Sequence, residues 1–201
     1  MSVLIIGNGS IGSHLVQKFI SKGHPVTIAL RNFDASTHPT FKYVIWCHGV
    51  NCNDSIGSLD HGAYMNTIDV NLHYTVKTLN DLIKYDKIEK GGRCLIISSI
   101  WQEFSRENKF SYTVSKAALG GLVRSCSIDL GKRGIFINAL LPGPIDNEMT
   151  RKNLTQEQID SLPGFVHLDD LWYLAEYLCV NNRSTNGQAI RVDFGLSAKM
   201  M

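Results

Sequence analysis

Residues 3–20, with the sequence VLIIGNGSIGSHLVQKFI, decide the fold of this chain. The stretch begins with four apolar residues, continues through a glycine-rich turn at residues 7–12, and ends in apolar side chains that recur at helical spacing. It therefore predicts a buried strand, a tight turn and a helix. In that setting the pattern G-x-G-x-x-G is typical of a turn that binds a dinucleotide.

The three glycines of this turn have different physical tasks. Gly7 permits the bend, Gly9 lets the backbone approach a pyrophosphate, and Gly12 lets the helix pack closely on the strand. The free N–H groups and the positive dipole end of the helix then favour phosphate groups. A structural turn without a ligand is the alternative interpretation.

The end of the second predicted strand, residues 25–30, indicates which dinucleotide binds. An NAD-specific site has an acidic residue there, which accepts hydrogen bonds from the ribose hydroxyls. This chain has Arg31 and Asn32 instead, and a guanidinium suits a 2′-phosphate. We therefore expect NADP as the cofactor. NAD stays the alternative, because Asp34 could still reach the ribose.

Apolar runs of strand and helix character alternate along the whole chain. We predict strands at 3–6, 25–30, 41–47, 93–98, 134–140 and 189–193, and helices at 12–22, 60–86, 111–132 and 168–180. This alternation predicts an α/β fold with a doubly wound parallel sheet of Rossmann type, formed as a single domain by residues 1–201. Ligands of such folds bind at the carboxyl ends of the strands.

Tyr112 and Lys116 are the most informative pair of polar residues. Their spacing of four places the phenol and the ammonium on one face of the predicted helix. A cation near a phenol favours the phenolate, so we expect Lys116 to lower the pKa of Tyr112 from about 10 towards working pH. Such a tyrosine can exchange a proton with a carbonyl or an alcohol oxygen.

Composition excludes several classes of function. The net charge is +2 without a basic cluster, so nucleic acid is not an expected partner. No apolar run reaches the length of a membrane span, and we expect the protein to carry no signal peptide. The five cysteines contain no C-x-x-C pair, which predicts reduced thiols, no metal site and a cytoplasmic location.

With these residues in hand, the chain resembles the short-chain dehydrogenase/reductase family over nearly its whole length. Five stretches carry the resemblance: the glycine turn; residues 44–49, VIWCHG; residues 69–72, DVNL; Ser99 with Tyr112 and Lys116; and residues 138–145, NALLPGPI. Residues 186–195 resemble the closing strand of the family. Ser99, thirteen residues before Tyr112, is the matching serine.

The resemblance implies a role for individual residues. Tyr112 matches the general acid/base, Ser99 the hydroxyl that binds the substrate oxygen, and Lys116 the residue that binds the nicotinamide ribose. Asn71 matches the residue that holds a water in a proton relay. The cofactor-binding residues that we expect are Gly7, Asn8, Gly9, Ser10, Ile11, Gly12, Arg31, Asn32, Cys47, His48, Gly49, Lys116, Pro142, Gly143 and Ile145.

The predicted activity is hydride transfer that interconverts a carbonyl and an alcohol on a small molecule. We expect the substrate pocket to be formed by Trp101, Gln102, Glu103 and Met149, with a substrate loop at about 144–167. The alternative is a dinucleotide-binding sensor or scaffold without catalysis. The resemblance also implies a homodimer or homotetramer built on the helices at 60–86 and 111–132, which carry apolar residues on more than one face.

The chain departs from the family between Arg31 and Trp46. Only 14 residues lie between them, too few for the helix and strand that family members place there. The missing segment normally supplies an aspartate to the adenine. Either the sheet loses one strand-and-helix unit, or residues 34–40 span the gap as a loop.

Overall fold

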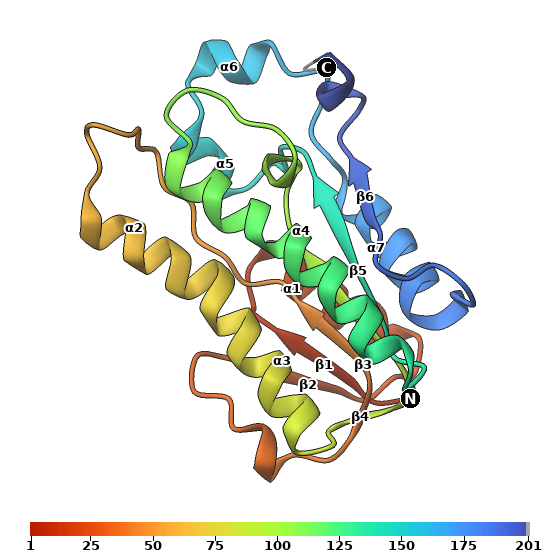
Figure 1. Ribbon diagram of the computed structural model, residues 1–201. Coiled ribbons are helices and arrows are strands. Elements are labelled where there is room, and N and C mark those ends of the chain that lie inside the picture. Colours follow the sequence, from red (N-terminus) through yellow and green to blue (C-terminus); the bar gives the residue numbers. More distant parts are fainter. Residues whose placement is uncertain (200–201) are drawn as a thin grey trace.

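The computed structural model describes residues 1–199 and has one parallel sheet between two layers of helices (Figure 1). The strands are β1 (Val3–Ile6), β2 (Val26–Ala29), β3 (Phe41–Trp46), β4 (Ile88–Ile97), β5 (Phe136–Pro142) and β6 (Ala189–Val192). Their order in the sheet is β2-β1-β3-β4-β5-β6, and every neighbouring pair is parallel. The doubly wound fold predicted from the sequence is confirmed.

The helices follow the predicted runs, with interruptions that the sequence did not indicate. They are α1 (Ser10–Ser21), α2 (His61–Ile68), α3 (Tyr74–Lys84), α4 (Phe110–Gly131), α5 (Glu148–Asn153), α6 (Gln156–Asp160) and α7 (Leu168–Glu176). The predicted helix at 60–86 forms as α2 and α3, joined by a π-helical turn at Asp69–His73. A second π-helical turn, Tyr177–Asn181, continues α7.

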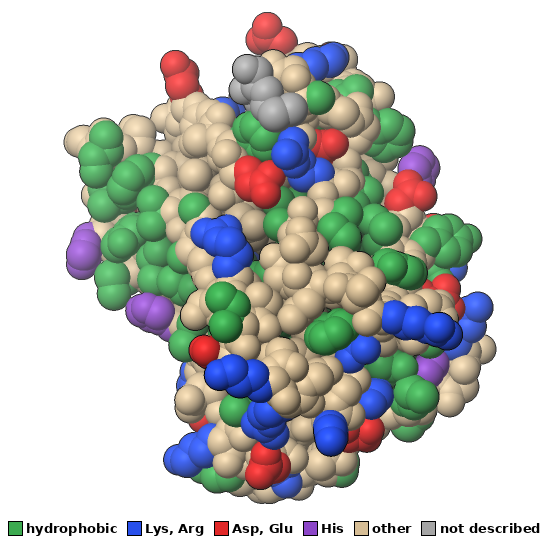
Figure 2. Space-filling view, turned by 45° about the vertical axis from the view of Figure 1, so that its right-hand side comes forward, with side chains coloured by type: hydrophobic (Ala, Val, Ile, Leu, Met, Phe, Trp, Pro, Cys, Tyr) green, Lys and Arg blue, Asp and Glu red, His purple; other side chains and the backbone are tan. Residues whose placement is uncertain are grey.

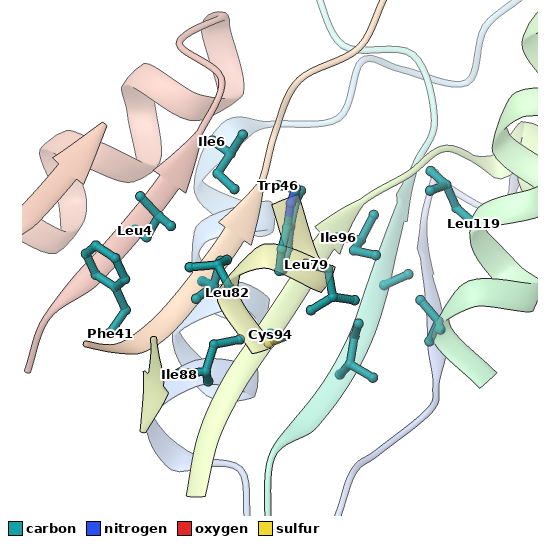
Figure 3. Close-up of a cluster of buried hydrophobic side chains, with 14 of the residues drawn as sticks. Leu4, Ile6, Phe41, Trp46, Leu79, Leu82, Ile88, Cys94, Ile96 and Leu119 are labelled. Atoms are coloured by element: carbon teal, nitrogen blue, oxygen red, sulfur yellow. The ribbon is translucent and has the colours of Figure 1, made fainter. Parts of the chain in front are cut away.

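In the middle of the sheet both faces are buried, which explains why central strands such as β1 and β3 read as continuous apolar runs. In β1, Leu4 and Ile6 belong to the core cluster beneath α3 and α4, whereas Val3 and Ile5 belong to the cluster beneath α1 and α7. Figure 3 shows the first cluster, in which side chains of β1, β3 and β4 meet Leu79 and Leu82 of α3 and Leu119 of α4.

The shortened segment leaves β2 as the edge of the sheet. Residues 30–40 connect β2 to β3 and contain only the short 3₁₀ turn Ala35–Thr37. Phe33 and Ala35 are buried there in the cluster that α3 covers, so the connection itself closes this part of the core. The sheet therefore lacks one unit, and a loop spans the gap.

Two details differ from the predicted elements. β4 begins at Ile88, five residues before the predicted start, and the predicted loop at 144–167 contains the short helices α5 and α6. Asn147 caps α5 and Thr155 caps α6 through hydrogen bonds to backbone N–H groups. Within residues 1–199, none of the helices combines the length and apolar character needed to cross a membrane.

Candidate functional site

The glycine turn between β1 and α1 has the tight geometry that its sequence predicts. Gly7 has φ +102°, a conformation that favours glycine, and a Cβ added there would lie 2.7 Å from the His48 backbone nitrogen. A Cβ at Gly12 would lie 2.2 Å from the Gly7 carbonyl oxygen, whereas one at Gly9 would meet no atom within 4 Å. Gly12 therefore packs α1 closely on the end of β1, Gly7 packs closely on the segment after β3, and Gly9 faces open space.

A cleft of about 1150 Å³ lies over the carboxyl ends of β1, β2, β3 and β4. No side chain caps the first turn of α1, so N–H groups at its start remain free beside Gly9. The cleft is lined by Gly7, Asn8, Gly9, Ser10, Ile11, Ala29, Leu30, Arg31, Asn32, Cys47, His48, Gly49, Val50, Asn66, Asp69, Val70, Tyr74, Ile97, Ser98, Tyr112, Lys116, Asn147, Glu148 and Met149.

One end of this cleft, which we call the α4 end, is formed by Tyr112 and Lys116. The Lys116 Nζ atom lies 5.6 Å from the centre of the Tyr112 ring, and Lys116 is only 3 % exposed. Ser99 precedes the 3₁₀ turn Ile100–Gln102 and is also buried; its hydroxyl accepts a hydrogen bond of 3.3 Å from the Trp101 N–H. The phenol of Tyr112 and the ammonium of Lys116 thus line this end of the cleft; the Ser99 hydroxyl is hydrogen-bonded to Tyr112, but Ser98 and not Ser99 is in the lining.

The pKa values at this end reflect burial. Burial raises the pKa of Tyr112 to about 12, and the Ser99 hydroxyl opposes this shift only in part. Burial also lowers the pKa of Lys116 to about 8. The predicted lowering of the Tyr112 pKa by Lys116 is therefore wrong for the chain by itself, because the phenol is removed from water and that effect is the larger one.

Asn71 lies in the π-helical turn between α2 and α3 and is fully enclosed. Its side chain accepts a 2.8 Å hydrogen bond from the Val50 N–H and donates to the Val50 carbonyl at 3.0 Å. It also donates to the Ser115 hydroxyl at 2.9 Å. The π turn brings a polar side chain inward, where it holds the segment after β3 against α4.

The opposite end of the cleft, the β2 end, consists of Leu30, Arg31, Asn32 and Tyr74. Arg31 and Asn32 are exposed, and Leu30 is 63 % exposed. The Tyr74 hydroxyl donates a short hydrogen bond to the Leu30 carbonyl, which ties α3 to the end of β2. Since β2 is the edge strand, no further strand shields this end.

His48 lies between the two ends. Its Nε2 atom is 3.1 Å from the Thr75 hydroxyl, and its ring contacts the Tyr74 ring edge-on at 5.1 Å. Burial, reinforced by the positive charge of Lys116, lowers the pKa of His48 to about 4. Neighbouring Cys47 has a pKa raised to about 12 by burial, so it is no reactive thiolate at neutral pH.

The comparisons with known proteins agree with this geometry. Residues 35–197 match the family model described as Enoyl-(Acyl carrier protein) reductase. The 3-oxoacyl-[acyl-carrier-protein] reductase FabG of Rickettsia prowazekii is 32 % identical over 136 residues, which are 64 % of this chain and 56 % of that protein. The chain belongs to the short-chain dehydrogenase/reductase family.

Solved structures of this family share the fold. A short chain dehydrogenase family protein from Francisella tularensis superposes with a TM-score of 0.87 at 18 % identity, covering 98 % of both chains. BdcA in complex with NADPH has a TM-score of 0.84 at 21 % identity, covering 96 % of this chain and 92 % of that one. At such identities the likeness shows the fold alone.

The curated relatives are longer than the segment matched. The match spans little more than half of the Rickettsia reductase. The L-rhamnose 1-dehydrogenase (NADP(+)) of Thermoplasma acidophilum is 37 % identical over 93 residues, which are 45 % of this chain and 35 % of that protein. Membership of the short-chain dehydrogenase/reductase family is thus established, while activity and substrate have to be argued from the site.

The structure brings most of the predicted residues of this family site together, but not all. Trp101, Gln102 and Glu103 do not line the cleft. The Glu103 carboxylate pairs with Arg191 at 3.0 Å, Gln102 packs against Gly120 of α4, and Trp101 packs on the core. Of the predicted substrate-pocket residues, Met149 alone is in the lining.

The predicted cofactor residues at and after the end of β5 also do not line the cleft. The Gly143 N–H donates to the Val192 carbonyl at 2.9 Å, so Pro142 and Gly143 continue the pairing of β5 with β6. Ile145 is buried in the core cluster beneath α7. Gly12 and Asn71 likewise support the lining from behind.

Several lining residues were missed by the sequence analysis. Asn66, Val70 and Tyr74 are spaced by four along α2, the π turn and α3, so helical spacing could have found them. Asn147 caps α5 and donates to the Ser10 hydroxyl at 3.2 Å, which links the segment after β5 to the glycine turn. That contact joins positions 137 residues apart and leaves no sequence signal.

Proposed function

We propose that this chain is an NADP(H)-preferring oxidoreductase that interconverts a carbonyl and an alcohol, with Tyr112 as the general acid/base. The observation that carries the proposal is the placement of Tyr112 and Lys116 in one cleft with the glycine turn and the start of α1. Family membership supports hydride-transfer chemistry, and the relative from Thermoplasma acidophilum is named for NADP(+).

The residues present fit a dinucleotide. Gly9 leaves open space for a pyrophosphate beside the uncapped N-terminus of α1, and Arg31 offers a guanidinium at the β2 end. Lys116 would meet the ribose next to the nicotinamide. When bound, the nicotinamide supplies a hydride donor or acceptor.

The residues of the chain would divide the remaining work. Tyr112 donates its phenolic proton to the substrate oxygen in reduction and takes one in oxidation. Ser99 holds that oxygen by a hydrogen bond as charge develops on it. Lys116 stabilises the tyrosinate that remains, and Asn71 keeps Val50 and Ser115 in place around the pair.

The segment at about 144–167 is proposed to cover the substrate. Met149 and Glu148 of α5 line the cleft, and the contact between Asn147 and Ser10 bridges its two walls. A small molecule bound beside Tyr112 would then be enclosed by α5. The substrate itself is proposed only as a small carbonyl or alcohol compound.

A homodimer or homotetramer is proposed as the assembled form, on the basis of an apolar surface. Met65 of α2, Val76 of α3 and Val114 of α4 are each more than one third exposed. Figure 2 shows hydrophobic side chains gathered on the left of the molecule, the side on which α2 lies in Figure 1. A second copy could cover this surface by a two-fold contact.

Two measurements test the proposal. NADPH at about 100 times its Kd should add about 2.7 kcal/mol to the free energy of unfolding, and NADH should add less at the same concentration. A panel of small carbonyl compounds should then support NADPH oxidation, followed by absorbance. Stabilisation by NADPH without turnover of any compound would favour the sensor or scaffold, and stabilisation by neither cofactor would exclude both.

A further inference from the structure

Lys109, just before the first residue of α4, is a buried cation that the proposed reaction does not yet use. It is only 2 % exposed and is among the largest fully buried side chains of the chain. Its Nζ atom donates to the side-chain oxygens of Asn51, at 2.8 Å, and of Asn53. Because removing an ammonium from water is costly, its burial calls for an explanation.

The position of Lys109 relative to Tyr112 matches that of Lys116. The Lys109 Nζ lies 5.7 Å from the centre of the Tyr112 ring, and the Lys116 Nζ lies 5.6 Å from it. Lys109 lies three positions before Tyr112 in the sequence, and Lys116 lies four positions after it. Two ammonium groups therefore lie at nearly the same distance from the phenol ring.

The hydrogen bonds of Lys109 do not require its charge. Both acceptors are neutral amides, and among residues 1–199 no carboxylate forms an ion pair with Lys109. The same loop is already held by Asn71, which bonds Val50. A neutral side chain could close the gap at lower desolvation cost.

The charged groups around Lys109 leave a positive surplus next to Tyr112. The Asp54 carboxylate accepts hydrogen bonds from the N–H and the hydroxyl of Ser111, so it is directed at the start of α4. Arg106 adds a further positive charge. Burial, together with Arg106 and against Cys52 and Asp54, lowers the pKa of Lys109 to about 8, so the side chain is still mostly charged at neutral pH.

We propose that Lys109 is a positioning residue that acts through Tyr112, as a second cation that stabilises the tyrosinate form together with Lys116. The inference rests on the proposed role of Tyr112 as the general acid/base. It accounts for the charge of Lys109, which a purely structural tie between α4 and the loop at 50–54 leaves unexplained.

The ionisation of residue 112 can be followed directly. Tyr112 is replaced by 3,5-difluorotyrosine, whose fluorines lower the pKa of the phenol into an accessible range and report ionisation by ¹⁹F NMR. Lys109→Gln keeps a hydrogen-bond donor but removes the charge. We expect the midpoint of the titration to rise by about half a pH unit or more in this variant.

Matched variants separate charge from structure. Lys109→Arg keeps the charge and should leave the midpoint within about 0.2 pH units of the parent, as should Lys132→Gln at the exposed end of α4. Asn51→Asp places a negative charge next to the Lys109 ammonium and should therefore raise the midpoint of the titration. This variant provides the test if Lys109→Gln does not fold.

An unchanged midpoint in folded Lys109→Gln, or in Asn51→Asp, would overturn the proposal and leave Lys109 as a structural tie. The titration requires neither substrate nor turnover. It can therefore fail while Tyr112→Phe still abolishes catalysis, and it can succeed in a chain that proves to lack activity. The two proposals are thus tested independently.

Discussion

The two ends of the cleft are built in opposite ways. At the α4 end, Tyr112 and Lys116 project from a helix of 22 residues and Lys109 directly precedes it; both lysines are almost fully buried. At the β2 end, Arg31 and Asn32 lie on an exposed connection after an edge strand of four residues. The residues proposed for chemistry are thus held in a buried network, whereas the residues proposed for cofactor recognition at the β2 end are exposed.

This difference indicates which part of the family fold can be shortened. The missing unit would lie beyond β2, at the edge of the sheet, and Phe33 and Ala35 close the exposed core in its place. The α4 end has no such freedom, because Asn71, Ser115 and Val50 depend on one another through hydrogen bonds. If the proposed function holds, loss at the edge should affect only cofactor recognition, whereas loss in the middle would remove the site.

The largest effect is expected at the α4 end. Tyr112→Phe removes only the transferable proton, so kcat should fall about 10²- to 10⁴-fold while NADPH still binds. Lys116→Ala should weaken both turnover and NADPH binding, since its ammonium is proposed to serve the phenol and the ribose. Steady-state kinetics with the carbonyl compound that the wild type reduces, together with cofactor titration, separate these results. Retention of more than about a tenth of wild-type kcat by Tyr112→Phe would exclude the proton-transfer role.

Between the two ends, His48 should make stability depend on pH. Burial lowers its pKa in the folded chain to about 4, against about 6.5 when unfolded. The unfolded chain therefore binds a proton first as pH falls, and up to about 3 kcal/mol of stability should be lost between pH 6.5 and 4. His48→Gln should lose correspondingly less, as measured by urea unfolding at both pH values.

A matched control for this measurement is His61→Gln, because His61 is exposed. It should lose the same stability between the two pH values as the wild type. If His48→Gln also loses as much as the wild type, the imidazole is not held neutral in the folded chain. In that case His48 would not belong to the buried, rigid part of the cleft at the α4 end.

At the β2 end, Arg31→Ala should weaken NADPH binding about 10- to 150-fold, or about 1.5–3 kcal/mol, and leave NADH nearly unaffected. The reason is that a charge-assisted bond to the 2′-phosphate exists only with NADPH. Isothermal titration with both cofactors measures the effect, and Arg183→Ala, whose side chain lies outside the cleft, is the control. Equal losses for both cofactors would show that Arg31 does not read the 2′-phosphate.

The fold could be read from the sequence because the central strands are buried on both faces, as in β1 and β3. Val3 to Ile6 are all fully buried, and such runs alternate with amphipathic helices along the chain. The pair of Tyr112 and Lys116 was visible for a similar reason, since four residues of helix fix their common face. Local spacing was sufficient in both cases.

The remaining features of the site depend on contacts between distant segments. Glu103 was expected in the substrate pocket, but Arg191 of β6 draws it away. The sequence around Lys109 does not distinguish it from an ordinary surface lysine. Its burial follows from contacts with Asn51 and Asn53, which are distant in the sequence. The raised pKa of Tyr112 is caused by burial, and burial cannot be inferred from the four-residue spacing between Tyr112 and Lys116.

The smallest effect on the site is expected from a change of oligomeric state. Measuring the mass of the oligomer tests whether the α4 end is stabilised by a second copy of the chain. The chain should sediment at two or four times 22.4 kDa, because Val114, 38 % exposed on α4, would otherwise keep an apolar surface in water. Val114→Glu should shift the mass towards the monomer, whereas Ile20→Glu on α1 should not. Val114 lies two residues from Tyr112 but is exposed to solvent. If the Val114→Glu variant is monomeric and keeps full turnover, the buried hydrogen bonds of Asn71 and Ser115 are sufficient to hold the α4 end without a partner subunit. A measured mass of about 22 kDa for the wild type at micromolar concentration would contradict the proposed oligomer. The α4 end would then be held in place by contacts within the single chain alone.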